Sequence, residues 1–303
     1  MKFDSEMIPE HAITAIRELV AAGGPEPHQY PVLHEWFRDM MHRHRLGEIT
    51  AQDISLLWEV FGDAFSPNTM QGFVVRKPHG YHGDYEIIDR IYTKWISPDP
   101  NLAKWDHFFH SCAAPEAVRN RKAFLHAVLH GMQAEEPNRT LQILSVGCGP
   151  ARDIAEFLSS GVDGTFHFTC LDQDPNAIDH ACMLCRHWPG HVTFLMVDVV
   201  RRLPEQSYDL VWAGGLFDYF PDRVFALMLR RLMKRVRQGG RLIVRNFSPR
   251  NSSRDYMEFG GWQLIHRAPE ELLSLAARVG IRESSCRIKA EPQRVNLFLE
   301  VHK

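Results

Sequence analysis

The sequence lacks a long apolar run and a large net charge of either sign across its 303 residues. No apolar stretch approaches the roughly 20 residues that a membrane-spanning helix needs. The N-terminus, residues 1–11, carries acidic side chains where a signal peptide would be basic and then apolar. The net charge of −2 gives no general attraction to nucleic acid or to a membrane surface. We therefore expect a cytoplasmic globular protein with neither membrane insertion nor a nucleic-acid partner.

Several functional motifs are missing as well. The chain has no GxxxxGK(S/T) phosphate loop and no GxSxG element, which disfavours a P-loop enzyme and a serine hydrolase. The six cysteines are scattered, as expected for reduced thiols in the cytosol. Cysteines and histidines between His180 and His191 resemble a metal cluster, but the CxxC there lies inside an expected helix. Because a closed zinc site needs four converging ligands, we expect no metal.

The two parts of the chain differ in the spacing of their apolar residues. Residues 1–135 show helical periodicity and little strand signal, with helices expected at Tyr30 to His44 and Ala117 to Met132. The polar segment Ala134 to Thr140 gives the best boundary. We therefore expect a helical domain over residues 1–135 and an α/β domain over residues 136–303.

Short apolar strands alternate with helices in the second domain. The strands are expected at Leu141 to Val146, Phe166 to Leu171, Val192 to Val197, Tyr208 to Ala213 and Arg241 to Phe247. Helices are expected at Asn176 to His187, Asp222 to Gly239 and Pro269 to Gly280, and a terminal antiparallel pair at Ile281 to Ile288 and Val295 to Val301. This alternation is typical of a doubly wound α/β sheet.

In such a sheet, ligands bind at the carboxyl ends of the strands. The first strand ends in Gly147-Cys148-Gly149, where glycines let the backbone turn tightly and approach a ligand. The second ends at Asp172, which can accept from ribose hydroxyls, and the third at Asp198, which can accept from an adenine amino group. Either acid could instead cap a helix or turn, as we expect of Asp174. Together, the three ends indicate nucleoside binding. Arg152 replaces the third glycine of an NAD fingerprint, which disfavours an oxidoreductase.

The segments SVGCGPARD, CLDQD and MVDV resemble motifs I, II and III of class I S-adenosylmethionine (SAM)-dependent methyltransferases. The resemblance implies a Rossmann-like fold with a doubly wound seven-stranded sheet and SAM as cofactor, with Asp172 near its ribose and Asp198 near its adenine. Ser145 stands where the family often has an acid, and Ala151 where it often has a third glycine. The aminoacyl end of SAM is therefore expected to be held differently, with Asp153 a candidate for its ammonium group.

A narrower resemblance covers roughly residues 70 to 300. The segments RKPHGYHGDYEIIDRIY, YDLVWAGGLFDYF and GWQLIHRAPEELLSLA, together with the glycine motif, are similar to the PhcB-like 3-hydroxy fatty acid methyl ester synthase family. This resemblance implies methyl transfer to the carboxylate of a 3-hydroxy fatty acid or a related small molecule.

The helical domain is expected to form a lid over SAM. We expect its Tyr81, Asp84 and Tyr85 near the sulfonium and the acceptor, although Asp84 equally suits a helix N-cap and the tyrosines a core. The aromatic side chains of this domain suit an apolar substrate and equally an ordinary helical core. They are Trp58, Phe61, Phe65, Phe73, Trp95, Trp105, Phe108 and Phe109.

The ends of the fourth and fifth strands are expected to face the acceptor. Gly214 and Asp218 follow the fourth strand, where methyltransferases usually meet their acceptor. We expect Gly214 to line the cofactor site and Asp218 to face the acceptor, although a packed turn would explain both equally well. Asn246 ends the fifth strand and is expected at the same rim. Arg119 or Arg121 could bind a carboxylate or lie on a solvated surface.

Three functional hypotheses follow. The first is a SAM-dependent methyltransferase acting on a small-molecule acceptor. The second is an enzyme that uses the 3-amino-3-carboxypropyl group of SAM, by transfer or cyclisation, and releases methylthioadenosine. The third is a nonenzymatic SAM-binding protein. The sequence leaves the acceptor and the oligomeric state open.

Overall fold

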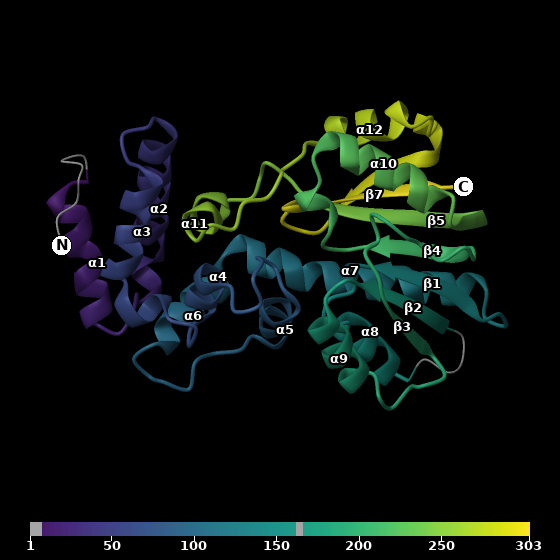
Figure 1. Cartoon of the computed structure of the whole chain (residues 1–303), viewed down its shortest axis with the longest axis horizontal. Coiled ribbons are helices and arrows are strands. Elements are labelled where there is room, and N and C mark those ends of the chain that lie inside the picture. The colour runs from purple at the N-terminus through teal and green to yellow at the C-terminus, as the bar shows by residue number, and fades with distance from the viewer. Residues whose placement is uncertain (1–7, 162–165) are drawn as a thin grey trace. The chain divides into compact units, whose positions relative to one another are not determined.

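The computed structural model describes residues 8–161 and 166–303, which divide into two compact units (Figure 1). The helical unit consists of Met1–Glu116 and Ser252–Gln263, and the sheet unit of Ala117–Asn251 and Leu264–Lys303. The chain therefore passes between the units at three points. This division differs from the boundary expected at residue 135, because the long helix before the first strand packs on the sheet.

The helical unit has short helices from both of its segments. They are α1 (Glu10–Ala21), α2 (Tyr30–Arg45), α3 (Ala51–Val60), α4 (Met70–Arg76), α5 (Tyr85–Thr93), α6 (Ala103–Ser111) and α11 (Arg254–Phe259), with 3-10 turns at Pro27–Gln29 and Gly62–Phe65. Thr50 caps α3 and exchanges hydrogen bonds with Asp53, which together form a capping box.

An aromatic core holds the helical unit together. The ring of Phe37 lies 5.1 Å from Phe259 and 4.7 Å from Tyr256, and Phe61 lies 4.3 Å from Phe65. The Tyr256 hydroxyl donates to Gln71 Oε1 at 2.8 Å. Residues 252–263 therefore supply core side chains to the unit formed mainly by the N-terminal residues. The aromatic residues Phe61, Phe65, Trp105, Phe108 and Phe109 are buried, as the core alternative expected.

The sheet unit contains one seven-stranded sheet in the order β3-β2-β1-β4-β5-β7-β6. The strands are β1 (Leu141–Val146), β2 (Phe166–Asp172), β3 (Val192–Met196), β4 (Tyr208–Ala213), β5 (Val236–Phe247), β6 (Cys286–Ala290) and β7 (Asn296–His302). The first five are parallel, whereas β7 pairs antiparallel with both β5 and β6. The expected doubly wound, seven-stranded sheet is confirmed, and its antiparallel edge is the expected terminal pair.

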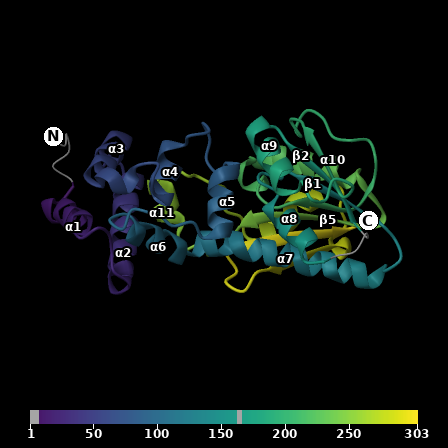
Figure 2. The same ribbon diagram turned by 90° about the horizontal axis from the view of Figure 1, so that it is seen from below.

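Helices cover both faces of this sheet. They are α7 (Ala113–Glu135), α8 (Arg152–Ser159), α9 (Pro175–Leu184), α10 (Asp222–Met233) and α12 (Pro269–Arg278), with 3-10 turns at Phe217–Tyr219 and Glu283–Ser285. Apolar side chains of α10 and α12 form one core with the strands, and those of α7, α8 and α9 form the other. Figure 2 shows α7 extending along the sheet beside α8. Among the described residues, no helix has the length and apolar character needed to cross a membrane.

Two elements have bounds that differ from those expected. The helix expected at Asp222 to Gly239 ends at Met233, because Val236 begins β5 and pairs with Tyr208. The strand expected from Ile281 begins only at Cys286, after a 3-10 turn. Val236 fits the apolar face of a helix as well as a strand, and Ile281 fits the start of a strand, so the spacing of apolar residues does not mark these two boundaries.

Candidate functional site

The loop between β1 and α8 has the backbone expected of a ligand-binding turn. Gly147 and Gly149 have φ angles of 66° and 53°, in the left-handed region that glycine adopts without strain. A Cβ on Gly149 would have no heavy atom within 4 Å, so its backbone borders open space. Cys148 N donates to Leu171 O at 2.9 Å and ties the loop to β2. Ala151 keeps a left-handed φ of 49° where the resemblance expected glycine.

Asp172 ends β2, and backbone amides orient both of its carboxylate oxygens. Oδ2 accepts from Gly149 N at 2.8 Å, and Oδ1 accepts from Asp174 N at 3.1 Å. Burial raises the pKa of Asp172, although these two donors oppose the rise. Each oxygen retains acceptor capacity for a further donor, such as a ribose hydroxyl. Asp174 caps α9 by accepting from Asn176 N at 2.9 Å, as its cap interpretation expected.

Asp198 lies in the turn after β3. Its Oδ1 accepts from Val200 N at 2.9 Å, and its Oδ2 lies 3.2 Å from Arg201 Nε. The carboxylate therefore caps the turn, which was the alternative to adenine binding. A carboxylate oxygen that caps a turn can accept a second donor, so the adenine role stays a prediction.

Asp153 begins the first turn of α8, beside the glycine loop. Burial raises the pKa of this carboxyl, and the positive charge of Arg121 on α7 is the largest influence opposing the rise. His126, also on α7, lies with Nε2 2.7 Å from Asp153 O. Lys122 Nζ pairs with Glu156 at 2.5 Å and ties the same two helices together. The site therefore receives side chains from α7 as well as from the strand ends.

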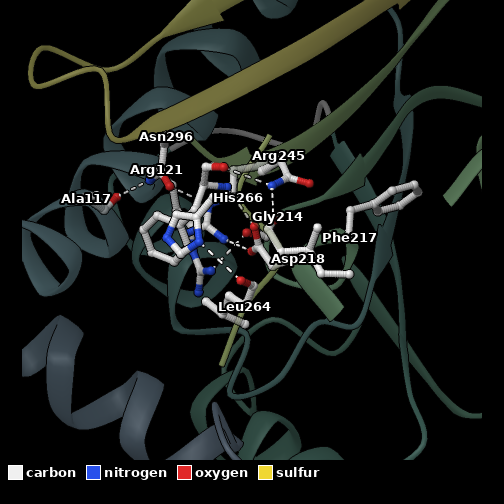
Figure 3. Close-up of polar contacts among 12 residues, drawn as sticks. Ala117, Arg121, Gly214, Phe217, Asp218, Arg245, Leu264, His266 and Asn296 are labelled. Carbon is white, nitrogen blue, oxygen red and sulfur yellow. Dashed lines mark hydrogen bonds and ion pairs between the residues drawn. The ribbon is translucent and has the colours of Figure 1, made fainter. Parts of the chain in front are cut away.

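Gly214 directly follows β4 and contacts Arg121. Arg121 Nη1 donates to Gly214 O at 2.9 Å (Figure 3). A Cβ on Gly214 would lie 2.8 Å from Trp212 Nε1, and one on Gly215 would lie 3.0 Å from Arg121 Nη1. The two glycines thus leave room for an indole on one side and a guanidinium on the other. Gly214 therefore has a packing role beside the cofactor role expected for it.

Asp218 belongs to a buried polar network (Figure 3). It pairs with Arg245 Nη1, and its Oδ1 accepts from Phe247 N at 2.6 Å. Arg245 Nε donates to Asn296 Oδ1 at 2.6 Å, and Asn296 Nδ2 donates to Ala117 O at 2.6 Å. Only 1% of Asp218 is exposed. The network joins the turn after β4 to β5, β7 and α7, as the packed-turn alternative expected.

Asn246 is equally buried and bonded. Its Nδ2 donates to Ile265 O at 2.7 Å, and its Oδ1 accepts from Arg267 Nη1 at 2.8 Å. Arg267 Nη2 also donates to Phe220 O at 2.6 Å. These contacts fix the chain segments at the carboxyl ends of β4 and β5. The catalytic roles expected for Asp218 and Asn246 stay predictions.

The three expected acceptor-site residues of the helical unit lie at the start of α5. Asp84 is buried and caps the helix, because its Oδ1 accepts from Glu86 N at 2.9 Å and Ile87 N at 3.0 Å. Burial raises the pKa of Asp84. Tyr81 is 41% exposed, and the Tyr85 ring lies 4.7 Å from that of His79. These residues are close in the helical unit, whereas Asp218 and Asn246 belong to the sheet unit.

The buried position of Arg121 was missed in the sequence, although a signal was present. Arg121 falls on the apolar stripe of α7, four residues after Ala117 and four before Leu125. A buried arginine lowers the stability of a protein unless a partner or a ligand compensates its charge. Arg121 is therefore a stronger candidate for ligand binding than Arg119, which is only partly buried. Within residues 8–161 and 166–303, no three His, Cys, Asp or Glu side chains form a group that could hold a metal.

Comparisons with known proteins agree with the sheet unit. Residues 143–240, about a third of the chain, match the family described as a methyltransferase domain. The fold is similar to that of a possible exported protein from Bordetella parapertussis, with a TM-score of 0.64 at 17% identity over 97% of this chain and 94% of that one.

A second similar structure is magnesium protoporphyrin IX methyltransferase from Synechocystis PCC 6803 with bound SAH, the demethylated form of SAM. Its TM-score is 0.50 at 15% identity, over 63% of this chain and 87% of that one. At such identities, these likenesses show the fold alone. None of the curated proteins matches this chain. The family match identifies residues 143–240 as a methyltransferase domain, for which the cofactor is SAM.

Proposed function

We propose that this chain, a SAM-dependent methyltransferase, methylates the carboxylate of a 3-hydroxy fatty acid or of a related small metabolite. The hydrogen bond from Gly149 N to Asp172 Oδ2 carries the cofactor part of this proposal. It joins the open glycine loop to the acid at the end of the next strand, which is the arrangement a nucleoside requires. The acceptor part rests on the resemblance of three further segments to methyl ester synthases.

The strand ends fit a nucleoside with a charged side chain. The left-handed Gly147 and Gly149 let the backbone approach the ligand, and Asp172 has acceptor capacity for ribose hydroxyls. Asp198 would accept from the adenine amino group, and Asp153 from the ammonium group. When bound, SAM supplies an electrophilic methyl carbon. The protein's own task is to align the acceptor and to exclude water.

A carboxylate acceptor requires little further chemistry. It is already ionised and nucleophilic near neutral pH, so no general base is compulsory. This agrees with the buried, hydrogen-bonded state of Asp218 and Asn246, to which we give a positioning role at the carboxyl ends of β4 and β5. We assign the helical unit to the acceptor as a lid, with Tyr81, Asp84 and Tyr85 at its reactive end.

The product nucleoside tests this function. The purified protein is incubated with methyl-labelled SAM and 3-hydroxy fatty acids of several chain lengths, and the products are analysed by mass spectrometry. We expect S-adenosylhomocysteine together with a labelled methyl ester, and less of both products from Asp172→Ala when SAM is below saturation. Methylthioadenosine above the spontaneous background would instead establish use of the aminocarboxypropyl group.

The acceptor class is tested separately. A panel of amines, alcohols and acids of similar size is compared under the same conditions. S-adenosylhomocysteine formed only with a noncarboxylate acceptor would keep methyl transfer and refute the carboxylate. We also propose a cytoplasmic location, where the cysteine thiols would stay reduced, and cell fractionation tests it.

A further inference from the structure

Arg121 is a buried cation on the helix that precedes the glycine loop. Its exposed fraction is 8%, and it lies on the same stripe of α7 as Val118, Leu125 and Leu129. Removing a guanidinium from water costs several kcal/mol unless close partners compensate. A solvated surface position, one of the two alternatives for this arginine, is therefore wrong.

The position of the guanidinium is fixed on two sides. Nη1 donates to Gly214 O at 2.9 Å, at the end of β4. Gly215 has no Cβ, and one built there would approach Nη1 to 3.0 Å. The backbone of α7 is itself held by the stacking of Phe124 on Phe298, with ring centroids 3.7 Å apart. The charge is thus held at the carboxyl end of the central strands, where ligands of such sheets bind.

A carboxylate of opposite charge completes this arrangement. Asp153 lies in the first turn of the neighbouring helix α8, and the positive charge of Arg121 opposes the rise that burial causes in the pKa of its carboxyl. The contact of His126 with Asp153 O at 2.7 Å fixes the spacing between α7 and α8. The site therefore presents one cation and one anion beside the glycine loop, which is the charge pattern that matches an amino acid zwitterion.

We propose that Arg121 binds a carboxylate in this site, and that it is the carboxylate of the methionine part of SAM. This rests on the proposed cofactor site and extends it. Asp153 then takes the ammonium group, so the two side chains share the aminoacyl end. Ser145, near the end of β1, is uncharged and only 4% exposed, so Asp153 is the acid beside the glycine loop that would hold the ammonium group. Arg121 would hold the carboxylate, because a guanidinium binds carboxylates through two parallel hydrogen bonds.

The test compares ligands that differ only at the aminoacyl end. Dissociation constants are measured by calorimetry without acceptor for S-adenosylhomocysteine, its decarboxylated analogue and methylthioadenosine. We expect the wild type to bind S-adenosylhomocysteine about 10- to 100-fold more tightly than the decarboxylated analogue, as for a hydrogen bond between charged groups. Arg121→Met should bind these two ligands about equally, and methylthioadenosine as the wild type does.

Arg119→Met is the matched control, since it removes the same group two residues away on the same helix. This variant should keep the wild-type ratio of the dissociation constants for the decarboxylated analogue and S-adenosylhomocysteine. Arg121→Lys keeps the positive charge but lacks the planar guanidinium, so it should retain part of the preference for S-adenosylhomocysteine over the decarboxylated analogue. If Arg121→Met fails to fold, the comparison of Arg121→Lys with the wild type tests the proposal.

Several results would overturn the proposal. One is a wild type that does not distinguish the decarboxylated analogue, and another is a ratio that survives in Arg121→Met. Equal losses for all three ligands would make Arg121 a purely structural residue. If Arg121→Met keeps its nucleoside affinities but has a raised KM for a carboxylic acceptor, then Arg121 binds the acceptor and not SAM. A wild type that binds none of the three nucleosides would refute the cofactor site itself, which is a separate outcome.

Discussion

The surroundings of Asp172 suit a residue that binds a ligand. Its carboxylate is partly buried at the end of β2, and backbone amides orient both oxygens. We expect Asp172→Ala to weaken SAM binding by at least about 10-fold, since a hydrogen bond to a charged group is worth about 1.5–3 kcal/mol. Calorimetry measures the affinity, and circular dichroism checks the fold. Asp174→Ala removes the cap of α9 but keeps the Asp172 carboxylate, so it should leave the SAM affinity nearly unchanged. Equal effects of the two substitutions would count against the site.

Asp106 gives the helical unit a distinct pH dependence. It is fully buried and accepts from Met70 N and Ser97 N, each at 2.7 Å. Burial raises its pKa to about 6, so the folded chain takes up a proton that the unfolded chain, with a carboxyl near 3.8, does not yet bind. The unfolding free energy of the wild type should therefore rise relative to Asp106→Asn as the pH falls through 6. Denaturant titrations between pH 8 and 5 measure the difference, and a constant difference would contradict the prediction.

At the scale of elements, the Asp218–Arg245 pair joins the turn after β4 to β5. Asp218→Asn keeps the shape but removes the carboxylate charge that pairs with the buried Arg245, and breaking such a pair costs about 3–5 kcal/mol. We expect a loss of that size in the unfolding free energy. The double variant Asp218→Asn/Arg245→Met should recover part of it, because it removes the buried positive charge as well. A stable Asp218→Asn protein that has lost only turnover would instead support the catalytic role.

The strands were predictable because a strand that is buried on both faces of a sheet consists mostly of apolar residues. Leu141–Val146 and Tyr208–Ala213 are short, mostly apolar segments that each end at a glycine, and their bounds are as expected. The end of α10 was not predictable, since Val236 suits a helix face as well as a strand. The same limit applies to acids. Whether Asp84 caps a helix or meets a substrate depends on contacts that residue spacing does not specify.

At the scale of the whole molecule, the helical unit is built from two segments that are far apart in the sequence. Tyr256 and Phe259 belong to the aromatic core of the helical unit, although they follow β5 in sequence. A chain shortened to residues 117–303 would carry these side chains without their partners. We expect it to aggregate, and to become monodisperse when residues 252–263 are replaced by a short glycine-serine link. Size-exclusion chromatography compares the two, and equal behaviour would contradict a core role for the segment.

The late position of residues 252–263 also matters while the protein is being made. Domains generally begin to fold as they leave the ribosome, and here the first unit emerges with a gap in its core. About 140 residues separate Glu116 from Tyr256, and at about 5–20 residues per second their synthesis takes roughly 7 to 28 seconds. During that interval Phe37 lacks the rings of Tyr256 and Phe259, so we expect the helical unit to complete its core only after residues 252–263 have been synthesised.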